Sequence, residues 1–467
     1  MKSKMKKVVL ALGGSAVALV LAAVVFVLTF DINSYKPRIE AAASTASGMK
    51  VRINGKIKLS LFPDAGISLE DIMIQKKGAD VASAKKAEVK IRLLPLLRRK
   101  VLIQQVKLVA PSFFITKDKN GRFNFERDKK KPFEIKKIII QGGHAQYLEE
   151  ITGIKAEAKD CDLSIQNLSS SGGGSFEALS FDGDMSCKDV KSKELRIADV
   201  QVDMKARGGK FEANPFSMNI FGGNCKGTIK GVMTGESREY SIDVAITKFR
   251  FEEVLGAFNQ KKSAHGELDI KSHLAMKGKD TTELTRTAQG DVSLRGHNLS
   301  IKSLDIDTML KKYEKSQNFN LVDLGAFFVV GPLGAVLTKG YDFGSAYKES
   351  LGGESTILKL VSDWKVRNGI AEAADVAFIT SKNRVALNGK LDFVNGRFED
   401  VTVAVLNANG CATQSQRIRG SFNKPRIDKP NIFRSLMGPV ISLATKSYDM
   451  LKGGRCEVFY RGSLAQP

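Results

Sequence analysis

The sequence predicts a mainly β protein, in which an N-terminal transmembrane helix precedes an elongated, open antiparallel β-groove with a few short amphipathic helices. Three observations lead to this fold class. One long stretch near the N-terminus, Val8–Phe30, carries no charge. Much of the remaining chain alternates apolar and polar residues with a period of two, as strands with one apolar face do. The 26 Phe, 42 Gly and single Trp are typical of a β protein punctuated by turns.

The uncharged stretch is long enough to cross a membrane. A helix over Val8–Phe30 rises roughly 35 Å, against a hydrocarbon core of about 30 Å. Lys2, Lys4, Lys6 and Lys7 precede it, which predicts a cytoplasmic N-terminus and a chain that lies mostly across the membrane. The alternative is a cleaved signal peptide, but the apolar run is long and ends in bulky residues, so we expect an uncleaved anchor.

The charge of the chain bears on its partners. A formal net charge of +23 makes nucleic acid the first partner to consider. The Lys and Arg residues are spread along the whole chain, however, and the anchor places them outside the cytoplasm. A basic surface near anionic lipid head groups is the better interpretation, and we expect no nucleic-acid partner.

Five cysteines are present, and none has the C-x-x-C spacing of metal knuckles or redox motifs. An oxidising compartment would permit disulfides. Cys411 and Cys456 are the favoured pair, because both lie in the C-terminal segment, far from the other three. The pairing of Cys161, Cys187 and Cys225 stays open, since an odd thiol remains however they pair.

After the anchor, a short helix capped by Asp31 leads into strands. Turns are expected at 62–66 and at Asn120-Gly121, the second closing a hairpin, and a bulge is expected at Glu70-Asp71. Residues Arg127–Lys131 form a basic linker. The apolar positions of the first strands alternate strictly with polar ones. They define one face, made of Val51, Ile53, Ile57, Leu59, Leu61, Ile67, Leu69, Val89 and Ile91.

One internal repeat stands out near the C-terminus. Residues 331–342 and 438–449 share Gly-Pro, Thr-Lys and Tyr-Asp at identical spacing. Pro at the first helical position is a normal helix start, so each copy predicts an amphipathic helix. The two helices either cover an apolar sheet surface or plug an apolar groove. Their apolar faces are Leu333, Val336, Leu337 and Tyr341 in the first copy, and Val440, Leu443 and Tyr448 in the second.

The order of several short motifs resembles the AsmA family of bacterial envelope proteins. The turn at Asn120 is similar to the family's Asp-Gly-x-x-Asn-aromatic turn, but with Asn120 in place of Asp and with Phe125 where Trp is common. The resemblance is strongest over residues 8–125, and a C-terminal stretch, 320–467, is also similar. The motifs are Phe30–Pro37, Arg52–Ile57, Leu61-Phe62-Pro63, Leu94–Leu97, Asn120–Phe125 and Cys456–Tyr460.

The resemblance implies a single-pass inner-membrane protein of Gram-negative bacteria whose periplasmic part is a chorein-like β-groove, as in bridge-like lipid transfer proteins. The implied role is to carry phospholipid between inner and outer membrane and so support outer-membrane biogenesis. The chain then divides into four segments. These are the basic stub and transmembrane anchor (1–30), the start of the groove (31–126), the central groove (132–300), and the AsmA-like C-terminal segment with the two Gly-Pro helices (301–467).

The physical chemistry agrees with this implication. A sheet with one apolar face must bury that face on something, and the chain has few helices to cover it. Acyl chains held against the face solve the problem, and each CH₂ group removed from water gains roughly 0.8 kcal/mol. The apolar residues of the first strands then line the groove, and sliding of lipid along it needs no catalytic residue.

Motifs of enzymes and cofactor sites are missing from the sequence. It contains no HExxH, GxSxG, P-loop or GxGxxG, and His265-Gly266-Glu267 matches half of a zinc-deaminase signature without the required cysteines. We therefore expect no enzyme activity, no cofactor and no metal. The alternatives to lipid carriage are an envelope scaffold that binds proteins through sheet edges and assists outer-membrane protein assembly, and, more remotely, a secreted hydrolase.

Overall fold

The computed structural model describes residues 31–60, 65–91, 103–125, 132–171, 176–193, 195–257, 264–302, 305–308, 310–311, 353–428, 431–432 and 457–465. Two compact units account for the chain. Unit 1 comprises Met1–Lys193 and Ala198–Gly209, and unit 2 comprises Glu194–Ile197 and Lys210–Pro467. The segment boundaries predicted near residues 126–132 and 300–301 fall inside these units.

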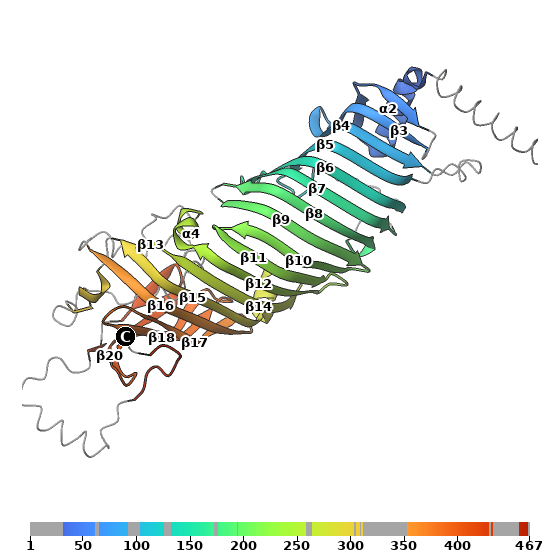
Figure 1. Ribbon diagram of the computed structural model, residues 1–467. Coiled ribbons are helices and arrows are strands. Elements are labelled where there is room, and N and C mark those ends of the chain that lie inside the picture. Colours follow the sequence, from blue (N-terminus) through green and yellow to red (C-terminus); the bar gives the residue numbers. More distant parts are fainter. Residues whose placement is uncertain are drawn as a thin grey trace, which may run out of the picture. The chain divides into compact units, whose positions relative to one another are not determined.

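Unit 1 begins with the predicted short helix and continues as strands (Figure 1). The Asp31 side chain accepts a hydrogen bond from the Asn33 N–H and so caps the first turn, and the helix ends at Gly48, where φ is +65°. The elements are η1 (Ile32–Tyr35), α2 (Lys36–Ser47), β1 (Lys50–Ile53), β2 (Ile57–Ser60), β3 (Gly66–Lys76), β4 (Ala79–Ile91), β5 (Ile103–Lys117), β6 (Phe133–Glu149), β7 (Lys155–Ser170), η2 (Phe176–Ala178), β8 (Leu179–Ser192) and β9 (Leu195–Arg207).

The strands of unit 1 form an open sheet that is antiparallel except at one pair. Both β1 and β2 pair with β3, and β3, β4 and β5 follow as antiparallel neighbours. Strands β5 and β6 are parallel, whereas β6, β7 and β8 are antiparallel again. The expectation of a wholly antiparallel sheet is therefore wrong at β5–β6.

The parallel pair follows a turn after β5 that does not continue into an antiparallel hairpin. The Asn120-Gly121 turn forms, with Gly121 N–H bonded to the Asp118 carbonyl, but the returning arm makes only one isolated bridge, between Lys117 and Phe123. The predicted hairpin therefore has no second strand. The next strand begins at Phe133 and runs alongside β5 in the same direction. A crossover connection of a dozen or more residues is what a parallel neighbour requires.

The pairing of β3 with β4 keeps its register at Glu70-Asp71, where a bulge was predicted, and the register shift of this pair lies at Ile74/Gln75 instead. Asp71 has a φ of +52°, and the pairing with β4 passes from Glu70↔Lys86 to Ile72↔Ala84. Asp tolerates this left-handed conformation better than most residues. The left-handed residue interrupts the alternation of the strand, and beyond it Ile72 is buried and Ile74 is half-buried.

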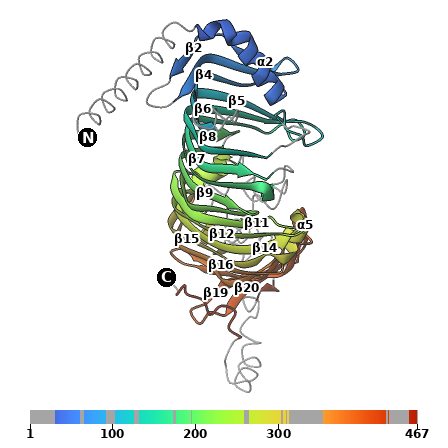
Figure 2. The ribbon, with the colours of Figure 1, turned by 90° about the vertical axis from the view of Figure 1, so that its right-hand side faces the viewer.

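The described residues of unit 2 form an antiparallel sheet and include the short helices α4 and α5. Strands β10, β11, β12, β14, β15, β16, β17, β18, β19 and β20 pair in that order, and β13, β21 and β22 add short pairings. Helix α5 lies beside β14 (Figure 2), where Lys277 N–H donates to Thr287 Oγ1 at 2.8 Å. The elements are β10 (Lys210–Ile220), β11 (Gly223–Val232), β12 (Arg238–Arg250), α4 (Phe251–Ala257), β13 (Ala264–His265), β14 (Glu267–Gly278), α5 (Thr281–Thr287), β15 (Gln289–Lys302), β16 (Glu354–Arg367), β17 (Ile370–Ile379), β18 (Arg384–Asp392), β19 (Arg397–Leu406), β20 (Ala412–Ser421), β21 (Lys424–Ile427) and β22 (Asn431–Ile432).

Strands β16 to β19 are buried on both faces. In β17, Val376 and Phe378 belong to one hydrophobic cluster, while Ala377 and Ile379 belong to a second. The first cluster extends from β12 to β20 and includes residues of α4, so this part of unit 2 has a filled interior. Because successive strand residues point to opposite faces, both faces of β17 are covered.

The C-terminal segment covers the second cluster. The Tyr460 hydroxyl donates to Asp375 and accepts from the Leu464 N–H, and the Arg384 guanidinium donates to the Leu464 carbonyl at 2.8 Å. Burial, reinforced by the hydrogen bond to Asp375, raises the pKa of Tyr460 to about 12. The phenol therefore stays protonated and keeps its hydrogen bond at any physiological pH.

Several predicted features fall outside the described residues, among them the basic linker Arg127–Lys131 and two longer segments. One is the transmembrane anchor Val8–Phe30, and the other is the pair of Gly-Pro helices with their faces at Leu333, Val336, Leu337, Tyr341, Val440, Leu443 and Tyr448. Among the residues that are described, no helix is long and apolar enough to cross a membrane.

Candidate functional site: the apolar face of unit 1

The apolar face of unit 1 is a set of cross-strand rows. Residues directly opposite each other on paired strands lie on the same face, so the register shows which side chains adjoin. The three rows hold no polar side chain from the first strands to β8. They are Ile57–Leu69–Ala87–Leu108–Ile140–Leu163–Met185, Leu59–Ile67–Val89–Val106–Ile138–Ile165–Gly183, and Val51–Ile74–Ala82–Phe113–Ala145–Ala158–Val190.

The opposite face of the same strands is polar. One of its rows runs Ser60–Gly66–Lys90–Gln105–Lys137–Gln166–Asp182. Ion pairs lie across it, such as Lys58 Nζ to Glu70 Oε1 at 2.6 Å. The hydrogen bond from Lys58 lowers the pKa of Glu70, so this carboxylate stays charged. Such exposed pairs add little stability, but they show that this face is turned to water.

The apolar face is only half-buried. None of the described residues of unit 1 belongs to either hydrophobic cluster, both of which lie in unit 2. Central positions such as Leu108, Ile140 and Leu163 keep part of their surface accessible. Ile53 and Ile57 are buried, at 2% exposure each, and so are Ile72 and Ala87, at 7% each. In the described part of unit 1, therefore, no second layer seals the face.

The sequence-predicted lining residues come together on this face. Strand pairing joins Ile57 to Leu69, Leu59 to Ile67, Ile67 to Val89, and Ile91 to Ile103, while Val51 and Ile53 pair with Ile74 and Ile72. Leu61 lies outside the described residues. A role of these residues in holding lipid stays a prediction.

The prediction of lining residues stopped too early along the chain. Strands β5 to β8 continue the same rows and supply the larger part of the face. The sequence of these strands does carry the signal, because apolar residues alternate with polar ones in most places. The apolar residues are Val106 and Leu108, Ile138 and Ile140, and Leu163 and Ile165. Only the pairing register could place them beside the first strands.

The edge of the sheet formed by β1 and β2 is blocked by side chains of η1 and α2. The backbone N–H groups of Val51, Ile53 and Ile57 donate to Ser44 Oγ, Glu40 Oε1 and Asn33 Oδ1 at 2.9, 2.6 and 2.8 Å. Unpaired edge N–H groups would otherwise invite another strand. These capping roles were not predicted, because they depend on how α2 docks and leave no periodic signal.

This edge gives a first testable prediction. Glu40→Ala should leave the Ile53 N–H without its acceptor, which costs about 2 kcal/mol for a bond to a charged group. Hydrogen exchange of the β1 and β2 amides should accelerate by about 30-fold if opening there is local. Glu40→Gln keeps an acceptor oxygen and should lose much less. Equal exchange in the wild type and Glu40→Ala would show that the bond does not hold the edge.

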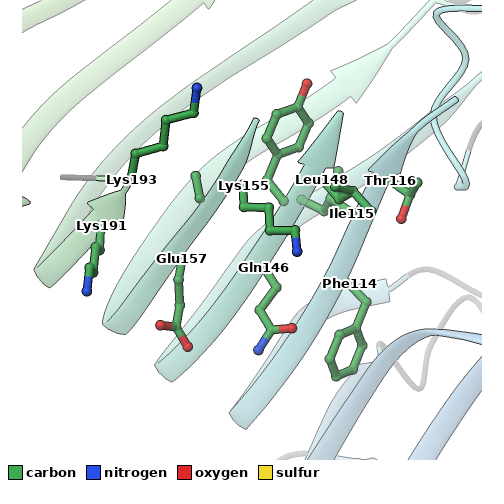
Figure 3. A pocket seen from close by; sticks show the side chains of 11 residues that line it. Phe114, Ile115, Thr116, Gln146, Leu148, Lys155, Glu157, Lys191 and Lys193 are labelled. Carbon is green, nitrogen blue, oxygen red and sulfur yellow. The ribbon is translucent and has the colours of Figure 1, made fainter. Parts of the chain in front are cut away.

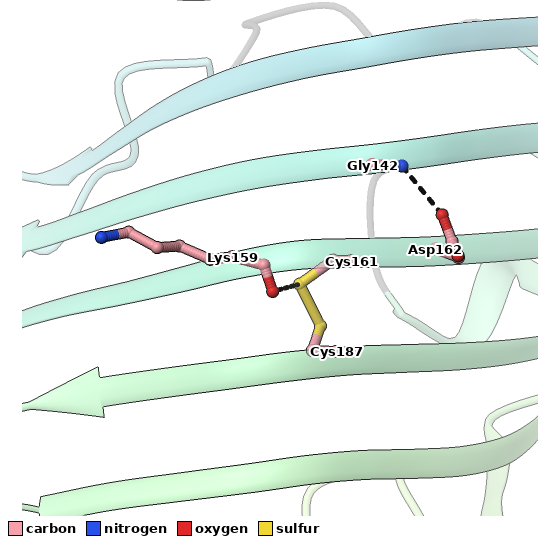
Figure 4. Close-up of a disulfide and its surroundings, with 5 residues drawn as sticks. All are labelled: Gly142, Lys159, Cys161, Asp162 and Cys187. Atoms are coloured by element: carbon pink, nitrogen blue, oxygen red, sulfur yellow. Dashed lines mark hydrogen bonds between the residues drawn. A yellow bond between two sulfur atoms is a disulfide. The ribbon is translucent and has the colours of Figure 1, made fainter.

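The cysteines of unit 1 form a cross-strand disulfide. Cys161 of β7 and Cys187 of β8 are direct register partners and are bonded to each other (Figure 4). Cys225 is the free thiol of the three, and burial raises its pKa. Cys411 is disulfide-bonded, but its predicted partner Cys456 lies outside the described residues, so that pairing stays a prediction. An isolated bridge does join Cys411 to Val458, two residues beyond Cys456.

The face as built can hold an apolar ligand by burial, with the ligand's polar part left in water. Within the described ranges, no group of three or more His, Cys, Asp or Glu residues could hold a metal ion. The chemistry that the described site offers is therefore that of a wide apolar surface bordered by charges.

Comparison with known proteins gave one result. A protein-family model described as the AsmA family matches residues 1–177 and again residues 149–329, together more than half of the chain. No curated protein and no solved structure is similar enough to the chain to count as a match. The family match confirms the resemblance that the sequence motifs indicated.

Proposed function

Because this chain belongs to the AsmA family, we propose that it carries phospholipid along the apolar face of unit 1, which acts as a β-groove between the inner and outer membranes. In this proposal the chain is anchored in the inner membrane by Val8–Phe30 and lies mostly in the periplasm. The acyl chains lie against the sheet and the head group stays in water. Carriage of this kind supports outer-membrane biogenesis and needs no catalytic residue.

The observation that carries this proposal is the long, half-buried apolar face. Three rows of apolar residues run from the first strands to β8 without a polar side chain. A soluble protein rarely exposes so large a contiguous apolar surface without a ligand or partner for it. Each CH₂ group of an acyl chain that leaves water on this face contributes up to roughly 0.8 kcal/mol, so a two-chain lipid can offset its loss of freedom.

Continuity of the rows also suits a mobile ligand. Isoleucine, leucine, valine and alanine side chains offer no directional hydrogen bond, so neighbouring positions along a row are nearly equivalent for an acyl chain. A lipid can then shift from one strand to the next with small barriers. The interior of unit 2, by contrast, is filled, and among its described residues no comparable surface lies between β14 and β20.

The alternative is an envelope scaffold that binds proteins through its sheet edges. The edge next to α2 does not favour it, because Ser44, Glu40 and Asn33 already occupy the N–H groups that an added strand would need. Lipid carriage accounts for the apolar face, which binding through sheet edges leaves unexplained, and we prefer it for that reason.

A crosslinking experiment tests the proposal. The full chain is extracted in mild detergent from cells in which a photoreactive amino acid replaces Leu163 or its neighbour Ser164. Leu163 belongs to an apolar row and Ser164 lies on the polar face. We expect phospholipid adducts, identified by mass spectrometry, from position 163 and few from position 164. Equal yields from both positions, or none from 163, would exclude lipid carriage on this face.

A further inference from the structure

Four large apolar side chains are exposed at one rim of unit 1, on two turns that follow β5 and β6. Phe123 and Phe125 lie in the turn after β5 and are 38% and 45% exposed. Ile151 and Ile154 lie in the turn between β6 and β7 and are 63% and 36% exposed. We call these four residues the rim tips. Single exposed apolar residues are ordinary, but a group of four at one rim is unusual for a surface in contact with water.

The turns that carry the rim tips are held in place. Asn124 donates from Nδ2 to the Phe114 carbonyl at 2.6 Å and accepts the Thr116 N–H at 3.2 Å, and the Phe123 and Phe125 rings stack at 5.3 Å between centroids. The second turn is tied to the first, because Glu150 N–H donates to the Lys117 carbonyl at 3.0 Å. The Lys117–Glu149 ion pair, at 2.8 Å, spans the same junction. The tips are therefore presented in a fixed arrangement.

A cationic pocket adjoins the rim tips. It has a volume of about 630 Å³ and lies across the ends of β5, β6, β7 and β8. Figure 3 shows Lys155, Lys191 and Lys193 around it, together with the apolar side chains of Phe114 and Leu148. None of these three lysines forms an ion pair with another residue of the described chain. Glu157 lies in the pocket but already accepts from His144 at 2.8 Å and pairs with Lys159 at 3.0 Å.

We infer that this rim is a docking site for an anionic phospholipid bilayer, in which the rim tips enter the head-group region and the three lysines bind lipid phosphates. Exposed aromatic and aliphatic residues beside lysines are the composition of surfaces that lie in a membrane interface. Lysines attract anionic lipid to such a surface, and an apolar tip alone gives only weak binding. This inference goes beyond the proposed function, because docking at the rim does not require a lipid-filled groove.

The charge of the site favours a bilayer surface over other ligands. The lysines lie beside apolar side chains, so one lipid layer can contact both: its phosphates bind the lysines and its acyl region contacts the apolar side chains. A free phosphate ion would use the lysines but leave the rim tips in water. The two halves of the site are adjacent in the chain as well as in space, since Ile154 immediately precedes Lys155.

Vesicle capture by the full chain tests the inference. The protein is reconstituted in phosphatidylcholine proteoliposomes, and fluorescent vesicles of phosphatidylcholine, with or without phosphatidylglycerol, are added. We expect capture of the anionic vesicles, weakened at high salt because screening shortens the reach of the lysine charges. Lys191→Gln/Lys193→Gln should weaken capture by about 30-fold, at about five-fold for each lysine. Ile151→Ser/Ile154→Ser should also reduce it, at unchanged net charge.

The matched control is Lys205→Gln/Lys210→Gln, which removes the same charge from exposed positions on β9 and β10. Equal losses in the two lysine variants would show that only net charge matters and would overturn the site. So would binding of inorganic phosphate at the pocket without vesicle capture. Circular dichroism checks that each variant folds. Lipid crosslinking from position 163 reports the groove separately, so that failure of docking and failure of carriage can be told apart.

Discussion

Ile140→Asp is expected to reduce the phospholipid bound to the full chain by about 100-fold while the protein stays folded. Ile140 lies in the middle of an apolar row, between Leu108 and Leu163, and is half-buried. In the empty face, water can reach an aspartate there. Beside an acyl chain the carboxylate would lose that water, and an aspartate in hydrocarbon costs about 3 kcal/mol. Mass spectrometry of lipid retained by the purified protein measures the effect.

The control for this change is the neighbouring residue. Ile139→Asp is the same substitution one position earlier, on the polar face, where Lys107 is the register partner on β5. It should retain lipid at the wild-type level. If Ile139→Asp and Ile140→Asp lose lipid equally, the loss comes from general destabilisation. If Ile140→Asp keeps its lipid, the apolar face does not hold acyl chains.

Ile57 would be a poorer site for the same experiment, although it belongs to the same row. It is 2% exposed, and its N–H is bound to Asn33 of η1. A carboxylate at this position would be buried without a partner, and the cost would appear as unfolding of the N-terminal edge. Loss of lipid could then have two causes. Substitutions in the middle of β6 and β7 avoid this ambiguity, because a carboxylate there can stay in water and the protein can stay folded.

Phe378→Ala is expected to lower the free energy of unfolding of unit 2 by about 3–5 kcal/mol. Phe378 is fully buried in the first hydrophobic cluster, among strands that are covered on both faces, so the truncation leaves a cavity that neighbours cannot fill. Chemical denaturation followed by the fluorescence of Trp364, which is the single tryptophan and lies in the same cluster, reports this unit directly.

Phe113→Ala is the matched comparison in unit 1. Phe113 lies on the apolar face and is half-buried, so its removal should cost less than about 1.5 kcal/mol in the absence of lipid. Hydrogen exchange of β5 measures this smaller effect. Equal destabilisation by the two truncations would mean that the apolar face of unit 1 is as closed as the interior of unit 2. That outcome would argue against a groove.

Local patterns in the sequence were enough to predict the helices and strands and to predict which face of each strand is apolar. The alternation of Ile57, Lys58 and Leu59 placed one side of β2 toward an apolar surface, and the structure has Ile57 buried and Lys58 exposed. The helix between Asp31 and Gly48 followed from a capping side chain at its start. The break in the alternation at Glu70-Asp71 indicated an irregular backbone, which the structure shows as a positive φ at Asp71. Each signal lies within a few residues of what it determines.

The partners of these elements were decided by the tertiary structure. Nothing near Lys117 shows that β6 pairs parallel to β5, because the direction depends on where the chain returns after residue 125. The Cys161–Cys187 disulfide depends on a register between strands 26 residues apart. The edge caps of Asn33, Glu40 and Ser44 depend on the docking of α2. All three features depend on contacts between residues that are far apart in the sequence.

The difference between an open and a closed apolar face is the clearest case. Ile138 and Ile140 of β6 alternate with other residues much as Val376 and Phe378 of β17 do, yet the first pair is half-buried and the second is sealed. Alternation with a period of two indicates that a strand has an apolar face, but it does not indicate what covers that face. Coverage is set by which distant strands fold over that face, and only the assembled sheet determines whether the surface is a core or a site for a ligand.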